Sequence, residues 1–66
     1  GPQARRAGPA AVRLVQQRLI ELGFLRGSAD GKFGPATQTA LMAFQRSRGL
    51  KADGVAGPLT RAKLFA

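Results

Sequence analysis

The sequence predicts an all-α fold, a compact three-helix bundle with an internal loop–helix repeat. Apolar residues recur at helical spacing in two long segments, and no segment has the pattern of a confident strand. In addition, one twelve-residue sequence motif occurs twice: Asp30 to Leu41 reads DGKFGPATQTAL, and Asp53 to Leu64 reads DGVAGPLTRAKL. The two copies agree at six positions and lie 23 residues apart. A repeat at fixed spacing indicates one supersecondary unit used twice.

The first nine residues show no periodic apolar pattern, and Gly1-Pro2 resembles the remnant left when a purification tag is cleaved. We therefore expect residues 1–9 to be a disordered linker or cleavage remnant. Residues 10–66 are expected to form one folded domain, cut from a longer protein.

The first helix is expected from about Ala10 to Leu22, and Gly23 is its expected stop because glycine readily adopts the left-handed conformation that ends helices. Phe24 and Leu25 should then fold back onto the helix. Its apolar stripe consists of Val12, Val15, Leu19 and Leu22.

The second helix is expected from about Pro35 to Arg48, and the third begins at Pro58 with about two turns. Each follows Asp-Gly, a tight-turn signal, and then Gly-Pro, in which glycine is an acceptable N-cap and proline suits the first helical position. Within the two loops, residues 32–33 could alternatively pair with residues 55–56 as a short strand. The expected core positions are Thr37, Ala40, Leu41 and Phe44 in the second helix and Leu59 and Leu64 in the third.

Composition excludes several function classes. The chain has no Cys and no His, which rules out a disulfide framework and a Cys/His zinc site, and we expect neither metal nor cofactor. No run approaches the roughly 18 apolar residues of a membrane span. The net charge of +8 predicts attraction to polyanions such as nucleic acid, acidic lipid or an anionic cell wall.

Catalysis is not expected from this inventory. The carboxylates are Glu21, Asp30 and Asp53, and both aspartates precede glycine, where the Asp side chain usually braces a turn. The serines have no histidine to activate them. We therefore expect the chain to be non-enzymatic.

Two glutamines and three phenylalanines have competing interpretations. Gln16 and Gln45 lie beside core positions, where a buried amide would tie down a loop backbone; the alternative is an amide that binds a ligand. Phe33 and Phe44 could act as platforms on which a sugar stacks, but both are expected in the core, because aromatic residues dominate small cores. Phe24 is the aromatic candidate for ligand contact. The chain contains neither Trp nor Tyr, so stacking of sugar rings on aromatic side chains is not expected to be the main source of affinity for a ligand.

Three segments in order, VRLVQQRLIELGFL, DGKFGPATQTALMAFQRSRGL and DGVAGPLTRAKL, resemble the three-helix, type 1 peptidoglycan-binding domain family over about Val12 to Leu64. The resemblance implies a non-catalytic module that tethers a covalently linked hydrolase or transpeptidase to peptidoglycan, in the periplasm or outside the cell. Such a domain also occurs in the propeptide of matrix metalloproteases, but its zinc-masking Cys is absent here.

We expect the ligand, a peptidoglycan stem peptide, to bind near the two repeated loops and the helix starts that follow them, where free N–H groups favour anions. Lys32 and Arg61 would supply opposite charge. The candidate ligand-binding residues are Phe24, Asp30, Gly31, Lys32, Gly34, Thr37, Asp53, Gly54, Gly57, Thr60 and Arg61.

Two alternatives remain at this stage. The charge would suit a nucleic-acid-binding helical module, although the basic residues are spread over the chain and form no concentrated recognition face, so a nucleic-acid partner is not favoured. The domain could also serve as a structural or protein-docking module within its parent, because fold alone does not fix function.

Overall fold

Three helices account for the regular structure of residues 9–66, the part of the chain that the computed structural model describes. They are α1 (Pro9–Glu21), α2 (Pro35–Ser47) and α3 (Pro58–Leu64). This confirms the expected all-α, three-helix fold. No strand occurs within the described range, so the possible pairing of residues 32–33 with 55–56 does not form. The predicted linker lies outside the described residues, except for Pro9, which begins α1.

The helix boundaries differ from the expected ones by single residues. Proline suits a first helical position, and α1 accordingly begins at Pro9 rather than at Ala10. At its other end, α1 stops before Leu22, and α2 stops before Arg48, which has cap rather than helical backbone angles. The starts of α2 and α3 at Pro35 and Pro58 agree with the prediction.

Both long helices end in the same hydrogen-bonded cap. After α1, the Phe24 N–H donates to the Leu19 carbonyl at 2.8 Å and the Gly23 N–H donates to the Ile20 carbonyl at 3.0 Å. After α2, the N–H groups of residues 49 and 50 donate to the carbonyls of residues 46 and 45 in the same way. This is the Schellman arrangement, and both terminal glycines have the positive φ that it requires. Gly23 is therefore a helix stop, as predicted, and Gly49 ends α2 in the same way.

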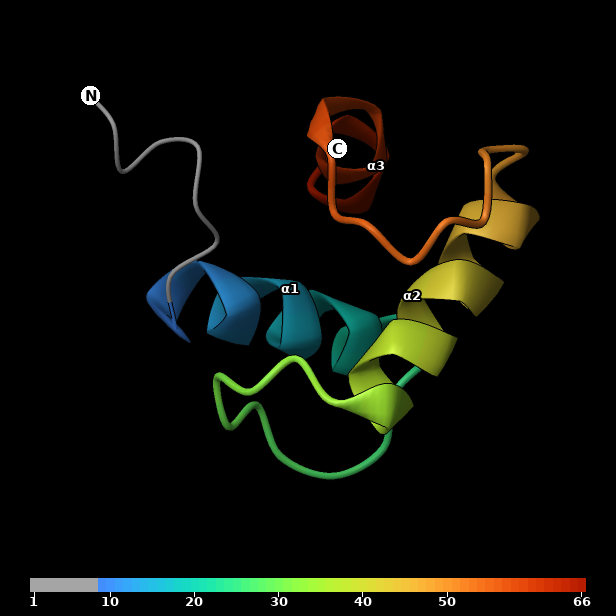
Figure 1. Ribbon diagram of the computed structural model, residues 1–66. Helices are drawn as coiled ribbons and strands as arrows, with labels where there is room; N and C mark the ends of the chain where they lie inside the picture. The colour runs from blue at the N-terminus through green and yellow to red at the C-terminus, as the bar shows by residue number, and fades with distance from the viewer. Residues whose placement is uncertain (1–8) are drawn as a thin grey trace.

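The core lies where α1 contacts both other helices. In the view of Figure 1, α3 lies above α1, and the chain that follows α1 loops back below it. Phe44 is fully buried and contacts the half-buried Phe24 edge to face, with ring centroids 5.7 Å apart. The buried apolar residues are Val12, Val15, Leu19, Leu25, Ala40, Leu41, Phe44 and Leu64.

Two core predictions are wrong. Leu59 is 75% exposed, because α3 buries the face that carries Thr60 and Leu64, and Leu59 precedes that face by one residue. Phe33 is 41% exposed, because hydrogen bonds between Gln16 and the loop, rather than an aromatic ring, close the start of α2. Both side chains are therefore available at the surface.

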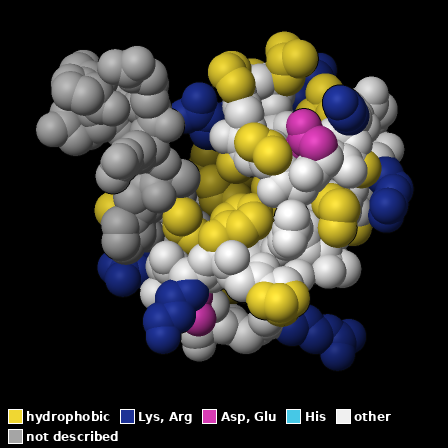
Figure 2. Space-filling view, in the orientation of Figure 1, with side chains coloured by type: hydrophobic (Ala, Val, Ile, Leu, Met, Phe, Trp, Pro, Cys, Tyr) yellow, Lys and Arg dark blue, Asp and Glu magenta, His cyan; other side chains and the backbone are white. Residues whose placement is uncertain are grey.

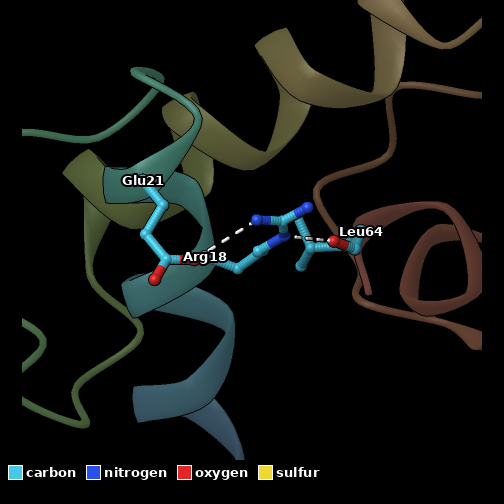
Figure 3. A network of polar contacts seen from close by, with 3 residues as sticks. All are labelled: Arg18, Glu21 and Leu64. Atoms are coloured by element: carbon cyan, nitrogen blue, oxygen red, sulfur yellow. Dashed lines mark hydrogen bonds and ion pairs between the residues drawn. The ribbon is translucent and has the colours of Figure 1, made fainter. Parts of the chain in front are cut away.

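Arg18 joins α1 to the end of α3. Its Nε donates to the Leu64 carbonyl at 2.8 Å, and its Nη1 lies 3.3 Å from a carboxylate oxygen of Glu21 (Figure 3). A cation at a helix C-terminus satisfies carbonyl groups that have no partner within the helix. The guanidinium of Arg18 thus pairs with Glu21 on the same helix and also fixes the short α3 against α1.

Candidate functional site

Gln16 holds the loop that precedes α2. Its Nε2 lies 2.9 Å from Asp30 Oδ1, 2.8 Å from the Lys32 carbonyl and 3.0 Å from Thr37 Oγ1. Its Oε1 accepts the Gly31 N–H at 2.8 Å. The side chain is 1% exposed, so these bonds form largely away from water. One α1 side chain therefore sets the shape of the first loop.

Gln45 of α2 does the same for the loop that precedes α3. Its Nε2 lies 2.9 Å from Asp53 Oδ1, 3.0 Å from the Val55 carbonyl and 3.0 Å from Thr60 Oγ1, and its Oε1 accepts the Gly54 N–H at 3.0 Å. Every partner occupies the position equivalent to that in the first loop. The structural interpretation of both glutamines, buried amides that tie down loop backbone, is confirmed.

The two aspartates complete these networks. Asp30 Oδ1 accepts the Lys32 N–H, and Asp53 Oδ1 accepts the Val55 N–H, each at 2.9 Å. These backbone hydrogen bonds lower the pKa of both carboxyl groups, and the glutamine amides lower the pKa further. Each carboxylate thus braces a turn, as the sequence predicted. A group held charged in this way is poorly suited to general acid catalysis.

The repeated loops also require glycine at defined points. Gly31 and Gly54, the glycines of the two Asp-Gly pairs, have φ of 79° and 71°. Gly34 and Gly57 are extended N-cap residues before Pro35 and Pro58, with no side-chain capping bond. Since Thr37 and Thr60 are buried against the glutamines, most of the repeated residues have contacts within the fold.

A groove of about 1060 Å³ lies between α1 and the chain around α3. Its walls come from one side of α1, from Phe33 of the first loop, from the second loop and from α3. Figure 2 shows hydrophobic side chains gathered in a hollow on this face. The lining residues are Ala11, Val12, Leu14 and Val15 of α1, Phe33, residues 54–57, and Pro58, Arg61, Ala62 and Phe65.

The groove gathers most of the large apolar side chains that remain exposed in the described residues. Leu14, Phe33, Val55 and Phe65 all line it, whereas Leu59 does not. Clustered exposed apolar groups mark binding surfaces more often than scattered ones. A mostly apolar concave surface with few polar groups is also the usual form of a ligand site. The groove is therefore the candidate binding site.

Three predicted site residues line the groove: Gly54, Gly57 and Arg61. Lys32 is exposed but does not line it, and Phe24 is half-buried against Phe44. The structure does not bring the remaining predicted residues to the groove wall; these are Asp30, Gly31, Gly34, Thr37, Asp53 and Thr60.

Sequence reasoning missed Leu14, Val55 and Phe65 as lining residues. A signal was present for Leu14, because it falls outside the stripe made by Val12, Val15 and Leu19. Val55 is likewise an apolar residue within a turn-rich loop. Apolar residues that do not fit the core pattern were the available clue.

Among residues 9–66, no group of three His, Cys, Asp or Glu side chains could hold a metal ion. None of the three helices is long and apolar enough to cross a membrane.

Comparison with known proteins relates this chain to one protein family. The family model "Putative peptidoglycan binding domain" matches residues 8–64. N-acetylmuramoyl-L-alanine amidase CwlM of Mycobacterium tuberculosis is 50% identical over 54 residues, which cover 82% of this chain and 13% of the amidase. The spore cortex-lytic enzyme of Oceanobacillus iheyensis is 48% identical over 50 residues, covering 76% of this chain and 18% of that enzyme.

A third relative, the zinc D-Ala-D-Ala carboxypeptidase of Streptomyces albus G, is 56% identical over 36 residues, covering 54% of this chain and 14% of the carboxypeptidase. The chain thus spans less than a fifth of the length of each of these three relatives. The comparison with solved structures gave no significant match.

Proposed function

Because the chain belongs to the peptidoglycan-binding domain family, whose model covers residues 8–64, we propose that it binds peptidoglycan and tethers a catalytic domain to the cell wall. The groove is the observation that carries the proposal, since it is the concave, apolar surface on which exposed side chains from α1, both loops and α3 meet. Weak, reversible binding suffices for this role, because a tether acts by raising the local concentration of the linked domain.

The linked domain is proposed to be a hydrolase or a transpeptidase. The relatives named above are an amidase, a cortex-lytic enzyme and a carboxypeptidase, and this chain corresponds to a small part of each. By analogy, the protein acts in the periplasm or outside the cell, in association with the wall. The analogy concerns the tethering role and leaves open which reaction the partner domain performs.

The module itself is proposed to be non-catalytic. Asp30 and Asp53 each accept hydrogen bonds that shape their own loops, and Glu21 pairs with Arg18. No His or Cys occurs in the chain. His and Cys, which commonly act as acid, base or nucleophile, are therefore absent, and both aspartates are engaged in holding the loops.

The stem peptide is the proposed partner, in preference to the glycan strand. The chain has neither Trp nor Tyr, whose flat faces with polar edges commonly support sugar binding. Among residues 9–66, the groove instead offers small apolar surfaces and the cation Arg61. Such a surface matches a peptide that carries methyl groups and carboxylates.

Ligand contact is assigned to Gly57 and Arg61, together with the apolar side chains beside them, whereas the buried Gly54 shapes the groove wall. Lys32 is an outlying cation that adds attraction at the first loop. The other predicted residues support the site indirectly by fixing the loops and the core; these are Phe24, Asp30, Gly31, Gly34, Thr37, Asp53 and Thr60.

Co-sedimentation with purified sacculi at several salt concentrations tests the proposal. Specific binding should persist at moderate salt, and soluble stem peptides should compete with sacculi whereas peptide-free glycan strands should not. Competition by glycan alone would contradict the stem-peptide assignment. Strongly salt-dependent binding to duplex DNA, without binding to sacculi, would replace the proposal with a nucleic-acid function.

A further inference from the structure

We propose that Arg61 makes this module selective for stem peptides with free carboxylates over the same peptides with their carboxylates converted to carboxamides. The inference rests on the proposed function and assigns a specificity-determining residue within the groove. It starts from charge: among the groove-lining residues that belong to the described part of the chain, Arg61 is the only charged side chain, and none of them is acidic.

The Arg61 side chain is largely uncommitted. It is exposed and belongs to no ion pair among residues 9–66. Within residues 9–66 it makes one hydrogen bond, in which Nε donates to the Gly57 carbonyl, one turn back along α3, over a long 3.4 Å. This contact leaves both terminal nitrogens of the guanidinium without a recorded partner in the described residues. Two parallel N–H groups on one cation fit the two oxygens of a carboxylate.

The surroundings of Arg61 favour a small, methyl-bearing ligand. Ala62 and Pro58 lie on the same short helix, and Val55 and Phe65 contribute exposed apolar surface to the same groove. A peptide that combines alanine methyl groups with a carboxylate would cover both kinds of surface. A phosphodiester polymer would satisfy the cation but not the apolar walls.

An amide in place of the carboxylate removes the paired hydrogen bonds and the opposite charge that Arg61 would recognise. A carboxamide is neutral and has only one oxygen, so it cannot accept a bidentate charge-assisted pair. Burying part of the guanidinium against a neutral group would also leave its charge without compensation. The groove should therefore distinguish two forms of one peptide that differ little in size.

The test uses soluble muropeptides released from sacculi by a muramidase, in untreated form and after chemical amidation of their carboxylates. Titration followed by backbone NMR should show about two- to fivefold tighter binding of the untreated form, the range expected for one charge-assisted pair at an exposed site. The same titration with Arg61→Gln should show equal, weak affinity for both forms. Arg61→Lys should retain part of the preference, because it keeps the charge and loses the planar fork.

Lys63→Gln is the matched control, because Lys63 is an exposed α3 cation that does not line the groove. It changes the net charge equally and should leave the preference intact. Equal binding of both peptide forms by the unaltered protein, or a preference that survives Arg61→Gln, would overturn the inference. A protein that binds sacculi yet shows no preference would refute only this inference, whereas failure to bind sacculi at all would refute the proposed function.

Discussion

The Gln45 side chain and the Asp53 carboxylate meet at 2.9 Å, and this contact connects the core of the domain to its candidate site. Gln45 is fully buried on α2, whereas Asp53 lies at the surface of the loop that leads to α3. The same loop continues through Gly54 and Val55 into the groove wall. Loop shape, and with it the groove, therefore depends on an amide in the protein interior.

Gln45→Ala should destabilise the domain by about 2 to 4 kcal/mol, because it leaves the Gly54 N–H and Thr60 without their recorded partner and opens a cavity. This loss is large for a domain of this size, whose core commonly supplies only about 3 to 5 kcal/mol. Urea unfolding followed by circular dichroism measures the effect. Gln17→Ala is the control, since Gln17 is exposed and should change the unfolding free energy by less than about 0.5 kcal/mol. Equal stability of the two variants would contradict the role of Gln45.

Acid should weaken both loops. The pKa values of Asp30 and Asp53 lie below the usual 3.8 in the folded state. A depressed folded-state pKa adds stability that is fully present above the unfolded-state value and is lost as pH falls through the folded-state value. The unfolding free energy should therefore decrease as the pH falls below about 5.

The variant Asp30→Asn/Asp53→Asn tests the origin of this acid dependence. Its amide oxygens keep the ability to accept hydrogen bonds but cannot titrate, so the slope of stability against pH should become shallower than in the unaltered protein. Urea unfolding at a series of pH values measures the slope. An unchanged slope would show that other groups cause the acid sensitivity.

Gly54→Ala should destabilise by about 1 to 2 kcal/mol, since a Cβ strains the left-handed conformation. A Cβ at this position would also lie 2.9 Å from Cγ of Gln38. Gly49→Ala is a matched comparison, because Gly49 has the same φ of 71° and nothing within 4 Å of the added atom. Thermal unfolding should show the larger loss for Gly54→Ala, and adding Gln38→Ala should remove the excess. If Gln38→Ala brings no recovery, the contact is not responsible.

Arg18→Gln should loosen α3, because it removes the donor to the Leu64 carbonyl. We expect a loss of about 1 kcal/mol and faster hydrogen exchange in α3 than in α2. Glu21→Gln tests the other half of the network in Figure 3, and it should cost less than about 0.5 kcal/mol because exposed ion pairs contribute little. A larger effect from Glu21→Gln would reverse the assigned importance of the two contacts.

The fold could be predicted because its main signals are local. Glycine stops such as Gly23, proline starts such as Pro35 and the periodic apolar face of α2 each act within a few residues. The hydrogen-bonding role of the buried glutamines could also be predicted, since a polar residue beside a core stripe must find hydrogen-bond partners.

The groove could not be predicted in the same way. It is formed by residues that are distant in the chain, with Leu14 on α1, Phe33 in the first loop and Phe65 after α3. Their common location depends on how α3 packs, which no local pattern specifies. The assumption that aromatic residues fill a small core also misplaced Phe33, because hydrogen bonds from Gln16 hold the first loop in a shape that leaves the Phe33 ring at the surface.

The most direct test of the central claim compares sacculus binding by Val55→Asp and Leu59→Asp. Both side chains are exposed and apolar, at 60% and 75%, and both substitutions change the net charge equally, but only Val55 lines the groove. Unfolding curves should first establish that both variants keep the fold. In co-sedimentation with purified sacculi at moderate salt, Val55→Asp should lose most of its binding while Leu59→Asp binds like the unaltered protein. Full binding by Val55→Asp, or equal losses in the two variants, would contradict the claim that this groove holds peptidoglycan.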